Sequence, residues 1–165
     1  MTEPAPNPIL NHPAVVRVRA ALARHDLDPE IVIFDDHAKT AAIAAEKLGI
    51  EVGQIANSLI FDADGEPLLV LTSGAHRVDL DKVKQVTGHT RISRASADFV
   101  REHTGQAIGG VAPVGHPAPV ATLVDVWLDR YEQVWAAAGH ANTVFGISPA
   151  ELLRITGGRA VDVEP

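Results

Sequence analysis

Cysteine is absent from the 165-residue sequence, so the chain can form neither a disulfide framework nor a thiolate metal site. This absence is consistent with a reducing compartment. The first residues lack the basic and apolar regions of a signal peptide, and no apolar run approaches the roughly 20 residues of a membrane-spanning helix. By elimination, we expect a cytoplasmic protein with no membrane partner.

Positive charge is also scarce, since 14 lysines and arginines stand against 21 acidic residues and give a formal net charge of -7. Proteins that clamp long stretches of phosphate backbone are usually basic. The composition therefore argues against extended nucleic-acid binding, but it leaves room for docking of a terminus or a small ligand. A small basic cluster lies between Arg77 and Arg94, where alternating aspartates favour a solvated helix face.

The apolar fraction of 46% predicts a globular fold with a buried core. Residues 1–12 are rich in proline and asparagine and predict a flexible lead-in, followed by a single domain over residues 13–165. Helices are predicted at 13–23, 41–48, 79–87, 96–103 and 149–155, and strands at 31–34, 54–61, 68–72, 90–93, 120–124, 133–138, 143–147 and 160–163. The fold class is therefore α/β (α+β-like), with a mixed, mostly antiparallel, barrel-like sheet surrounded by helices.

The segment from Gly105 to Pro117 is dense in glycine and proline. Glycine lets the backbone approach a ligand closely, adopt positive φ, and point N–H groups at an anion or a developing oxyanion. Pro113 and Pro117 stiffen the segment. Because loops of this length are uncommon in compact domains unless they are functional, we favour a small-molecule site over an ordinary loop.

Familiar cofactor and metal motifs are missing. The sequence has no GxxxxGK[ST] phosphate loop, no dinucleotide fingerprint, no HExxH pair and no GxSxG elbow, so no cofactor and no metal are expected. Among the eight histidines, His116 stands out because it lies in the stiff loop, and His37 and His140 follow it near predicted element ends. A catalytic triad assembled from distant residues stays open.

Asn57 and Ser58 form an adjacent polar pair at the start of an apolar strand. One of the two side chains must point to the interior, where a polar group needs a partner. A hydrogen bond that closes the sheet edge and a polar group presented to a pocket are equally good explanations.

Several segments together resemble the YbaK-like domain, which deacylates mischarged tRNA and is also inserted in bacterial prolyl-tRNA synthetases. The resemblance covers nearly everything from Pro13 to Val163 and rests on the order and spacing of short motifs. These motifs are the loop and helix of 37–49, the strand entry 55–61, the strand 69–72 with Arg77-Val-Asp-Leu80 after it, the GxxxP segment Gly109–Pro113, and 135–139 with the final Ser-Pro-Ala-Glu-Leu-Leu helix.

The resemblance implies hydrolysis of the ester that joins a wrong amino acid to the tRNA 3′ end. It also implies that Gly109–Pro113 bounds the amino-acid pocket and that its amides hold the carbonyl while water attacks, helped by the substrate's ribose hydroxyl. Such a site acts as a second sieve. The implied partner is the acceptor end of a mischarged tRNA, and association with an aminoacyl-tRNA synthetase and the oligomeric state stay open.

One position departs from the family pattern. The family usually has a lysine just before the Ser/Thr-Leu of the strand, and this sequence has Asn57, which can donate hydrogen bonds but carries no charge. Either Asn57 serves for positioning only, or the editing activity is altered or lost. The candidate catalytic residues are accordingly Asn57, Gly109, Gly110, Val111, Ala112 and Pro113, and the candidate substrate-binding residues are His37, Thr40, Ser58, Gly115, His116, Gly139 and His140.

Three classes of function remain open. The favoured class is a trans-acting aminoacyl-tRNA deacylase. The second is a non-catalytic binding module on the same fold that recognises an amino acid, a nucleotide end or a protein partner. The third is an unrelated metal-assisted hydrolase using His37, His116 or His140.

Overall fold

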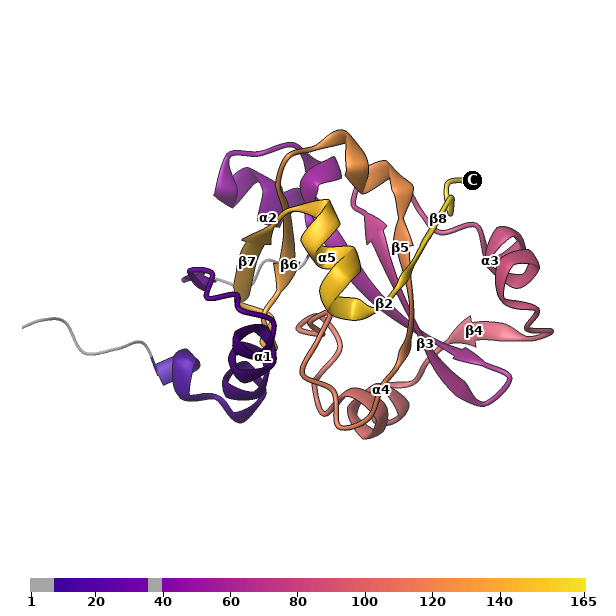
Figure 1. Ribbon diagram of the computed structural model, residues 1–165, viewed down its shortest axis with the longest axis horizontal. Helices are drawn as coiled ribbons and strands as arrows, with labels where there is room; N and C mark the ends of the chain where they lie inside the picture. Colours follow the sequence, from indigo (N-terminus) through magenta and orange to yellow (C-terminus); the bar gives the residue numbers. More distant parts are fainter. Residues whose placement is uncertain (1–7, 36–39) are drawn as a thin grey trace, which may run out of the picture.

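The computed structural model describes residues 8–35 and 40–165, so the first seven residues of the predicted lead-in and His37 lie outside the described residues (Figure 1). The helices are α1 (Pro13–Arg24), α2 (Ala41–Leu48), α3 (Leu80–Thr87), α4 (Ala97–Thr104) and α5 (Pro149–Thr156), with 3-10 turns η1 (Pro8–Asn11), η2 (Val52–Gln54) and η3 (Val126–Arg130). Within the described ranges, no helix is both long and apolar enough to cross a membrane.

Two sheets organise the fold. A five-stranded sheet has the order β4-β2-β3-β5-β8, antiparallel across β4, β2 and β3 and parallel across β3, β5 and β8, and an antiparallel three-stranded sheet has the order β1-β7-β6. The strands are β1 (Val32–Ile33), β2 (Ala56–Ala63), β3 (Glu66–Ser73), β4 (Ile92–Arg94), β5 (Ala121–Asp125), β6 (Val134–Ala137), β7 (Thr143–Ile147) and β8 (Arg159–Val161). The predicted mixed, mostly antiparallel α/β fold is confirmed.

The two sheets meet where β2 begins. Ile55, directly before β2, makes an isolated parallel bridge to Trp135 in β6. In the described part of the chain the strands remain two sheets rather than one closed ring, so the sheet system is open and not a complete barrel. The seam between the sheets is where a cavity can form.

An Asp-Gly pair makes the hairpin turn between β2 and β3. Asp64 and Gly65 both have positive φ, 51° and 88°, as a two-residue turn with the twist of the flanking strands requires. The two strands extend beyond the predicted ranges 54–61 and 68–72, because Ala63 pairs with Glu66 and the pairing continues up to the turn. The side chain of Asp62 accepts the Gly65 N–H at 2.8 Å and thereby fixes the turn.

Helix boundaries follow the local signals of the sequence. In α2, α3, α4 and α5 a side-chain oxygen accepts the first free backbone N–H groups, and a glycine in the left-handed region ends the helix. The caps are Thr40, Asp79, Ser96 and Ser148, and the terminating glycines are Gly49, Gly88, Gly105 and Gly157.

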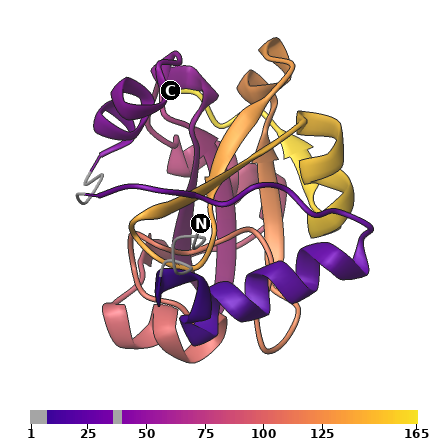
Figure 2. The same cartoon turned by 90° about the vertical axis from the view of Figure 1, so that its left-hand side faces the viewer.

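The core lies on both faces of the five-stranded sheet. Four consecutive residues of β3, Leu68 to Leu71, are at most 2% exposed, as expected for a central strand covered on both sides. Leu69 and Leu71 pack with α1, α5 and β7, whereas Leu68 and Val70 pack with Val83 of α3. Helix α1 lies on the side of the molecule away from α3, facing the viewer in Figure 2.

Candidate functional site

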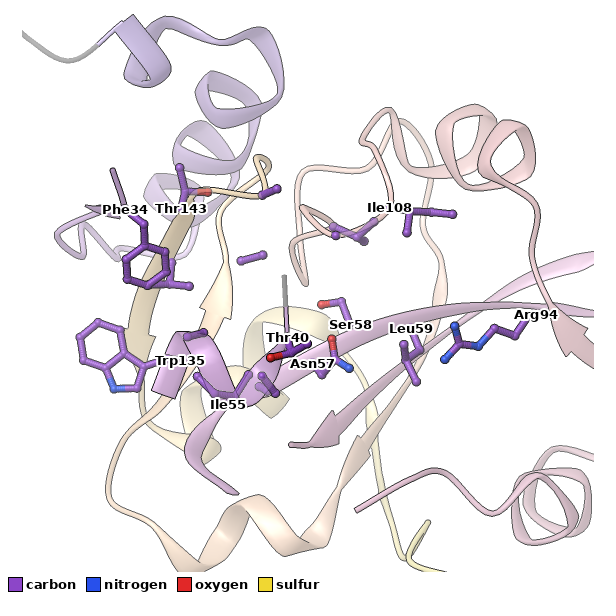
Figure 3. Close-up of a pocket in the computed structure, with 18 residues that line it drawn as sticks. Phe34, Thr40, Ile55, Asn57, Ser58, Leu59, Arg94, Ile108, Trp135 and Thr143 are labelled. Atoms are coloured by element: carbon purple, nitrogen blue, oxygen red, sulfur yellow. The ribbon is translucent and has the colours of Figure 1, made fainter. Parts of the chain in front are cut away.

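A cavity of about 340 Å³ lies at the seam between the two sheets. The start of β2, the strands β6 and β7, helix α2 and the loop after α4 surround it (Figure 3). Its lining residues are Phe34, Thr40, Ala41, Ala44, Ile55, Ala56, Asn57, Ser58, Leu59, Arg94, Ile108, Gly109, Val111, Trp135, Ala137, Ala141, Thr143 and Val144.

The cavity wall is mainly apolar and almost uncharged. Arg94 is the one charged side chain among its described lining residues, and no aspartate, glutamate or histidine contributes to that lining. Figure 3 shows the Arg94 side chain reaching from its strand toward Leu59, with Phe34 and Trp135 at the opposite end. At the end formed by Phe34 and Trp135, away from Arg94, a charged ligand group would lose hydration without a compensating partner, so this end of the cavity suits a small uncharged group.

Asn57 and Ser58 both line the cavity at the start of β2, although their side chains point to opposite faces of the strand. The hydroxyl oxygen of Ser58 is buried and has no hydrogen-bond partner in the described part of the chain. Asn57 is exposed, and its side chain likewise makes no hydrogen bond to a described group. The sheet-edge hydrogen bond considered from the sequence is therefore not found for either residue, and both polar groups are available to a ligand.

The glycines at 109 and 110 allow the loop to approach the 140–141 segment. A Cβ on Gly110 would lie 2.8 Å from backbone atoms of His140 and Ala141, so no side chain fits there without moving the backbone. Gly109 has φ of 91°, and a Cβ there would meet nothing closer than 4.0 Å. Gly110 is thus required by close packing, and Gly109 by its backbone conformation.

The amide of Gln106 holds the loop in shape. Gln106 is 2% exposed, its Oε1 accepts the Ala112 N–H at 2.6 Å, and its Nε2 donates to the Val114 carbonyl at 3.2 Å. The Thr104 hydroxyl accepts the Gln106 N–H at 3.1 Å. One buried side chain therefore crosslinks both arms of the loop, a role the sequence analysis missed.

Two loop amides remain available to a ligand. The Gly110 N–H donates to the Ala107 carbonyl at 3.0 Å, and the Ala112 N–H is taken by Gln106. Neither Gly109 nor Val111, both of which line the cavity, donates its N–H to an acceptor among residues 8–35 and 40–165. Free amides beside a cavity are the groups that stabilise a developing oxyanion.

The remaining candidates from the loop lie outside the cavity. Ala112 and Pro113 are buried behind it, and Gly115 packs against the backbone of Val18 in α1, where a Cβ would lie 3.1 Å away. The ring of His116 turns back and donates from Nε2 to the Ala112 carbonyl at 2.9 Å. Burial lowers the pKa of His116 below its ordinary 6.5, and the contact with Ala112 opposes this only partly.

The predicted residues from the other segments divide into lining and supporting positions. Thr40 lines the cavity and also caps α2 by accepting the Ile43 N–H at 3.1 Å. Gly139 has φ of 104° and lies against the start of α1, where a Cβ would be 2.9 Å from the Ala14 backbone. The Nδ1 atom of His140 accepts the Asn142 N–H at 3.0 Å, which shapes the turn that brings Ala141 to the cavity.

Several lining residues were not predicted as site residues, among them Phe34, Arg94 and Ile108. Arg94 is the last residue of the short strand β4. Of these three residues, Arg94 had a sequence feature that could have identified it as a site residue, namely its place in the basic cluster of 77–94. No group of three or more histidine, aspartate or glutamate side chains in the described ranges could hold a metal ion. The metal-assisted hydrolase consequently finds no ligand set in that part of the chain.

A protein-family model described as "Aminoacyl-tRNA editing domain" matches residues 35–155. This stretch contains all the described cavity-lining residues except Phe34. The match therefore covers the whole loop, the start of β2 and the seam between the sheets.

Two curated relatives extend over most of the chain. The "Uncharacterized protein YwhH" of Bacillus subtilis is 31% identical over 136 residues, which cover 82% of this chain and 86% of that protein. The "Putative Cys-tRNA(Pro)/Cys-tRNA(Cys) deacylase EbsC" of Enterococcus faecalis is 24% identical over 81% of this chain and 82% of its own length.

A solved structure has the same fold over nearly its whole length. It is described as "Crystal structure of a putative trans-editing enzyme for prolyl tRNA synthetase" and superposes with a TM-score of 0.88 at 39% identity. The superposition covers 93% of this chain and 98% of that one.

Proposed function

The chain belongs to the aminoacyl-tRNA editing domain family, and on that premise we propose that the cavity at its sheet seam binds the aminoacylated 3′ end of a mischarged tRNA. The protein is a trans-acting aminoacyl-tRNA deacylase, which hydrolyses the ester between the wrong amino acid and the terminal ribose. The observation that carries the site assignment is the pair of free loop amides beside a mainly apolar cavity.

The chemistry follows from the groups that surround the ester. Water attacks the ester carbonyl, and the N–H groups of Gly109 and Val111 stabilise the negative charge that develops on its oxygen. Because no carboxylate or imidazole lines the described cavity, the neighbouring ribose hydroxyl of the substrate assists the attacking water. Ser58 and Asn57 hold the substrate in position through hydrogen bonds.

The cavity also selects the amino acid. Its apolar wall between Ile55, Val111 and Trp135 favours a small uncharged side chain, because a charged one would be buried without a partner. A synthetase discriminates only weakly between amino acids that differ by one methylene. A second site of limited size therefore hydrolyses tRNA that carries an amino acid smaller than the correct one. Alanine, serine and cysteine are the amino acids that fit this description.

The partner is the acceptor end of tRNA, and the relationship to a trans-editing enzyme for prolyl-tRNA synthetase makes tRNA(Pro) the first candidate. The same proposal includes action in the cytoplasm and contact with the synthetase that releases the charged tRNA. The proposed hydrolysis uses no cofactor and no metal ion.

A deacylation panel tests the proposal. Purified protein is incubated with tRNA(Pro) carrying alanine, serine, cysteine or proline, with and without a chelator, and release of the amino acid is measured. We expect rapid release of at least one small amino acid, slow release of proline, and no effect of the chelator. If no charged tRNA is hydrolysed, the chain is a binding module on the same fold, and chelator-sensitive hydrolysis instead favours a metal enzyme.

A further inference from the structure

A second hollow, of about 370 Å³, lies on the opposite face of β2 from Ser58. We name it the arginine groove and define it by Asn57, Leu59, Thr72, His76, Arg77 and Arg94. Side chains alternate between the faces of a strand, so Asn57 and Leu59 share the face away from Ser58. The deacylase mechanism above uses nothing in this groove except Asn57.

The groove is positively charged in an acidic protein. Arg77 and Arg94 are both exposed, and no aspartate or glutamate belongs to the described groove lining. Neither guanidinium forms an ion pair or a hydrogen bond with a described group, whereas Arg154 pairs with Glu151 and Arg17 donates to the Gly105 carbonyl. Two unpaired guanidinium groups along one groove favour an anionic ligand.

The wall that carries Arg77 is anchored on a buried carboxylate. Nδ1 of His76 lies 2.7 Å from the Arg77 carbonyl, and Nε2 lies 2.8 Å from Oδ2 of Asp125. Asp125 is 1% exposed and accepts the N–H groups of Ser73 at 2.8 Å and Trp127 at 2.9 Å. The backbone of Arg77 is thereby held in place before any ligand arrives, which lowers the entropy lost on binding.

The arginine groove continues directly from the cavity. Asn57, Leu59 and Arg94 line both spaces, so a chain that leaves the cavity mouth passes Arg94 and enters the groove. Figure 3 shows Leu59 and Arg94 following Asn57 along this path. If the last nucleotide of a strand occupies the cavity, each linkage to a preceding nucleotide carries a phosphate, and these phosphates pass along the groove.

We infer that the arginine groove binds the phosphates of the single-stranded nucleotides that precede the aminoacylated 3′ end of tRNA. Arg94 meets the strand at the junction with the cavity, and Arg77 meets it farther along. This inference rests on the proposed function, since it takes the cavity as the place of the terminal nucleotide. It also revises the solvated helix face expected for residues 77–94, because Arg77 and Arg94 lie outside the helix and on either side of one groove.

The first test measures binding of a short single-stranded RNA with the tRNA 3′ sequence and no amino acid. Arg77→Gln is compared with the parent and with Arg19→Gln, a matched control at an exposed position on α1, across a series of salt concentrations. We expect Arg77→Gln to weaken binding about tenfold and to lower the slope of log K against log salt by about 0.7. The control keeps the parental affinity and slope.

The second test compares two substrates that differ in phosphate. The ratio of kcat/KM for mischarged tRNA to that for the same amino acid esterified to adenosine, which has no phosphate, is measured for each variant. Arg77→Gln should lower this ratio about tenfold, through KM. An equal loss on both substrates would assign Arg77 to the chemistry and overturn the inference.

The two tests also separate the inference from the proposed function. Absence of RNA binding by the parent, or identical affinity and salt slope in Arg77→Gln and the parent, overturns the groove assignment even when deacylation is observed. Conversely, Arg77-dependent RNA binding without hydrolysis of any charged tRNA supports the groove and rejects the deacylase. Binding of acidic peptides but not RNA to the parent would assign the groove to a protein partner and overturn the inference.

Discussion

At the scale of single residues, the unpartnered hydroxyl of Ser58 allows a role in substrate binding to be distinguished from a role in stability. A buried hydroxyl without a hydrogen bond contributes nothing favourable to folding, so its removal is neutral or stabilising. We predict that Ser58→Ala keeps or raises the melting temperature while it lowers kcat/KM for mischarged tRNA by roughly tenfold, the value of one hydrogen bond to the substrate.

The matched control for this prediction is Ser73→Ala. The Ser73 hydroxyl is buried, donates to the Gly53 carbonyl at 2.7 Å and accepts the Ala75 N–H at 3.2 Å, and it lies outside the cavity lining. Its removal leaves the carbonyl of the buried Gly53 without this partner and should lower the unfolding free energy by about 1–3 kcal/mol. Thermal unfolding and deacylation are measured on both variants. If Ser58 acts on the substrate, Ser58→Ala loses activity but not stability, and Ser73→Ala loses stability.

Asn57 is the residue at which the sequence resemblance predicts a departure from the family's usual lysine. A lysine would offer a charge-assisted contact to the substrate, roughly twice as strong as the hydrogen bond of an amide. We predict that Asn57→Lys raises kcat/KM for mischarged tRNA about fivefold, the equivalent of about 1 kcal/mol, and that Asn57→Ala lowers it.

Added positive charge alone could strengthen tRNA binding, so Val16→Lys provides the control. Val16 is 49% exposed on α1 and touches neither the cavity nor the arginine groove. Parental rates in both Asn57 variants would make the residue a bystander at the cavity mouth.

At the scale of the element, the loop after α4 depends on one glycine for its conformation. Gly109 has φ of 91°, and an alanine there is strained by about 1–3 kcal/mol even though its Cβ meets nothing closer than 4.0 Å. We predict that Gly109→Ala lowers stability by this amount and lowers deacylation at least tenfold, because the neighbouring amides shift away from the ester.

Gly65 offers the same backbone strain at a different place. It has φ of 88° in the hairpin turn, and a Cβ there would meet nothing within 4 Å. Gly65→Ala should therefore match Gly109→Ala in urea unfolding and keep the parental deacylation rate. Equal deacylation rates in the two variants would remove the loop amides from the mechanism.

The same loop makes stability depend on pH through His116. Because burial lowers the pKa of His116 in the folded state, the unfolded chain binds a proton more readily as the pH falls below the ordinary value of 6.5. The contribution of the neutral ring is therefore complete above pH 6.5 and is lost as the pH falls through the lowered pKa.

We predict that the parent loses stability between pH 7.5 and pH 5 and that His116→Gln loses less. Urea unfolding at a series of pH values gives the unfolding free energy of both proteins. The contributions of the acidic groups that both proteins share cancel in the difference. Parallel pH profiles for the two proteins would show that His116 is as accessible to protons in the folded chain as in the unfolded one.

At the scale of the whole molecule, a ligand in the cavity contacts both sheets at once. A non-hydrolysable amide analogue of an aminoacyl adenosine, at 100 times its Kd, should stabilise the fold by about 2.7 kcal/mol. We predict slower hydrogen exchange at the start of β2, in α2 and in residues 108–111, with no change in α5, which contributes nothing to the cavity lining. Protection spread evenly over the chain would place the ligand elsewhere.

The sequence by itself determined the local elements. Helix ends were predictable because Thr40, Ser96 and Ser148 cap backbone N–H groups three positions away, and glycines such as Gly49 end helices without steric strain. The hairpin was predictable because Asp64-Gly65 supplies the positive φ that its turn needs. The family resemblance was visible for the same reason, since its motifs are short and ordered along the chain.

Only the tertiary structure decided which candidates share one cavity. The loop near Gly109, the start of β2 at Asn57 and the turn at Ala141 are far apart in sequence, and the meeting of two sheets at the Ile55–Trp135 bridge brings them together. The same packing turns His116 away to the Ala112 carbonyl. Local patterns set backbone conformation through interactions a few residues long, whereas the direction of a side chain depends on what the rest of the core places beside it.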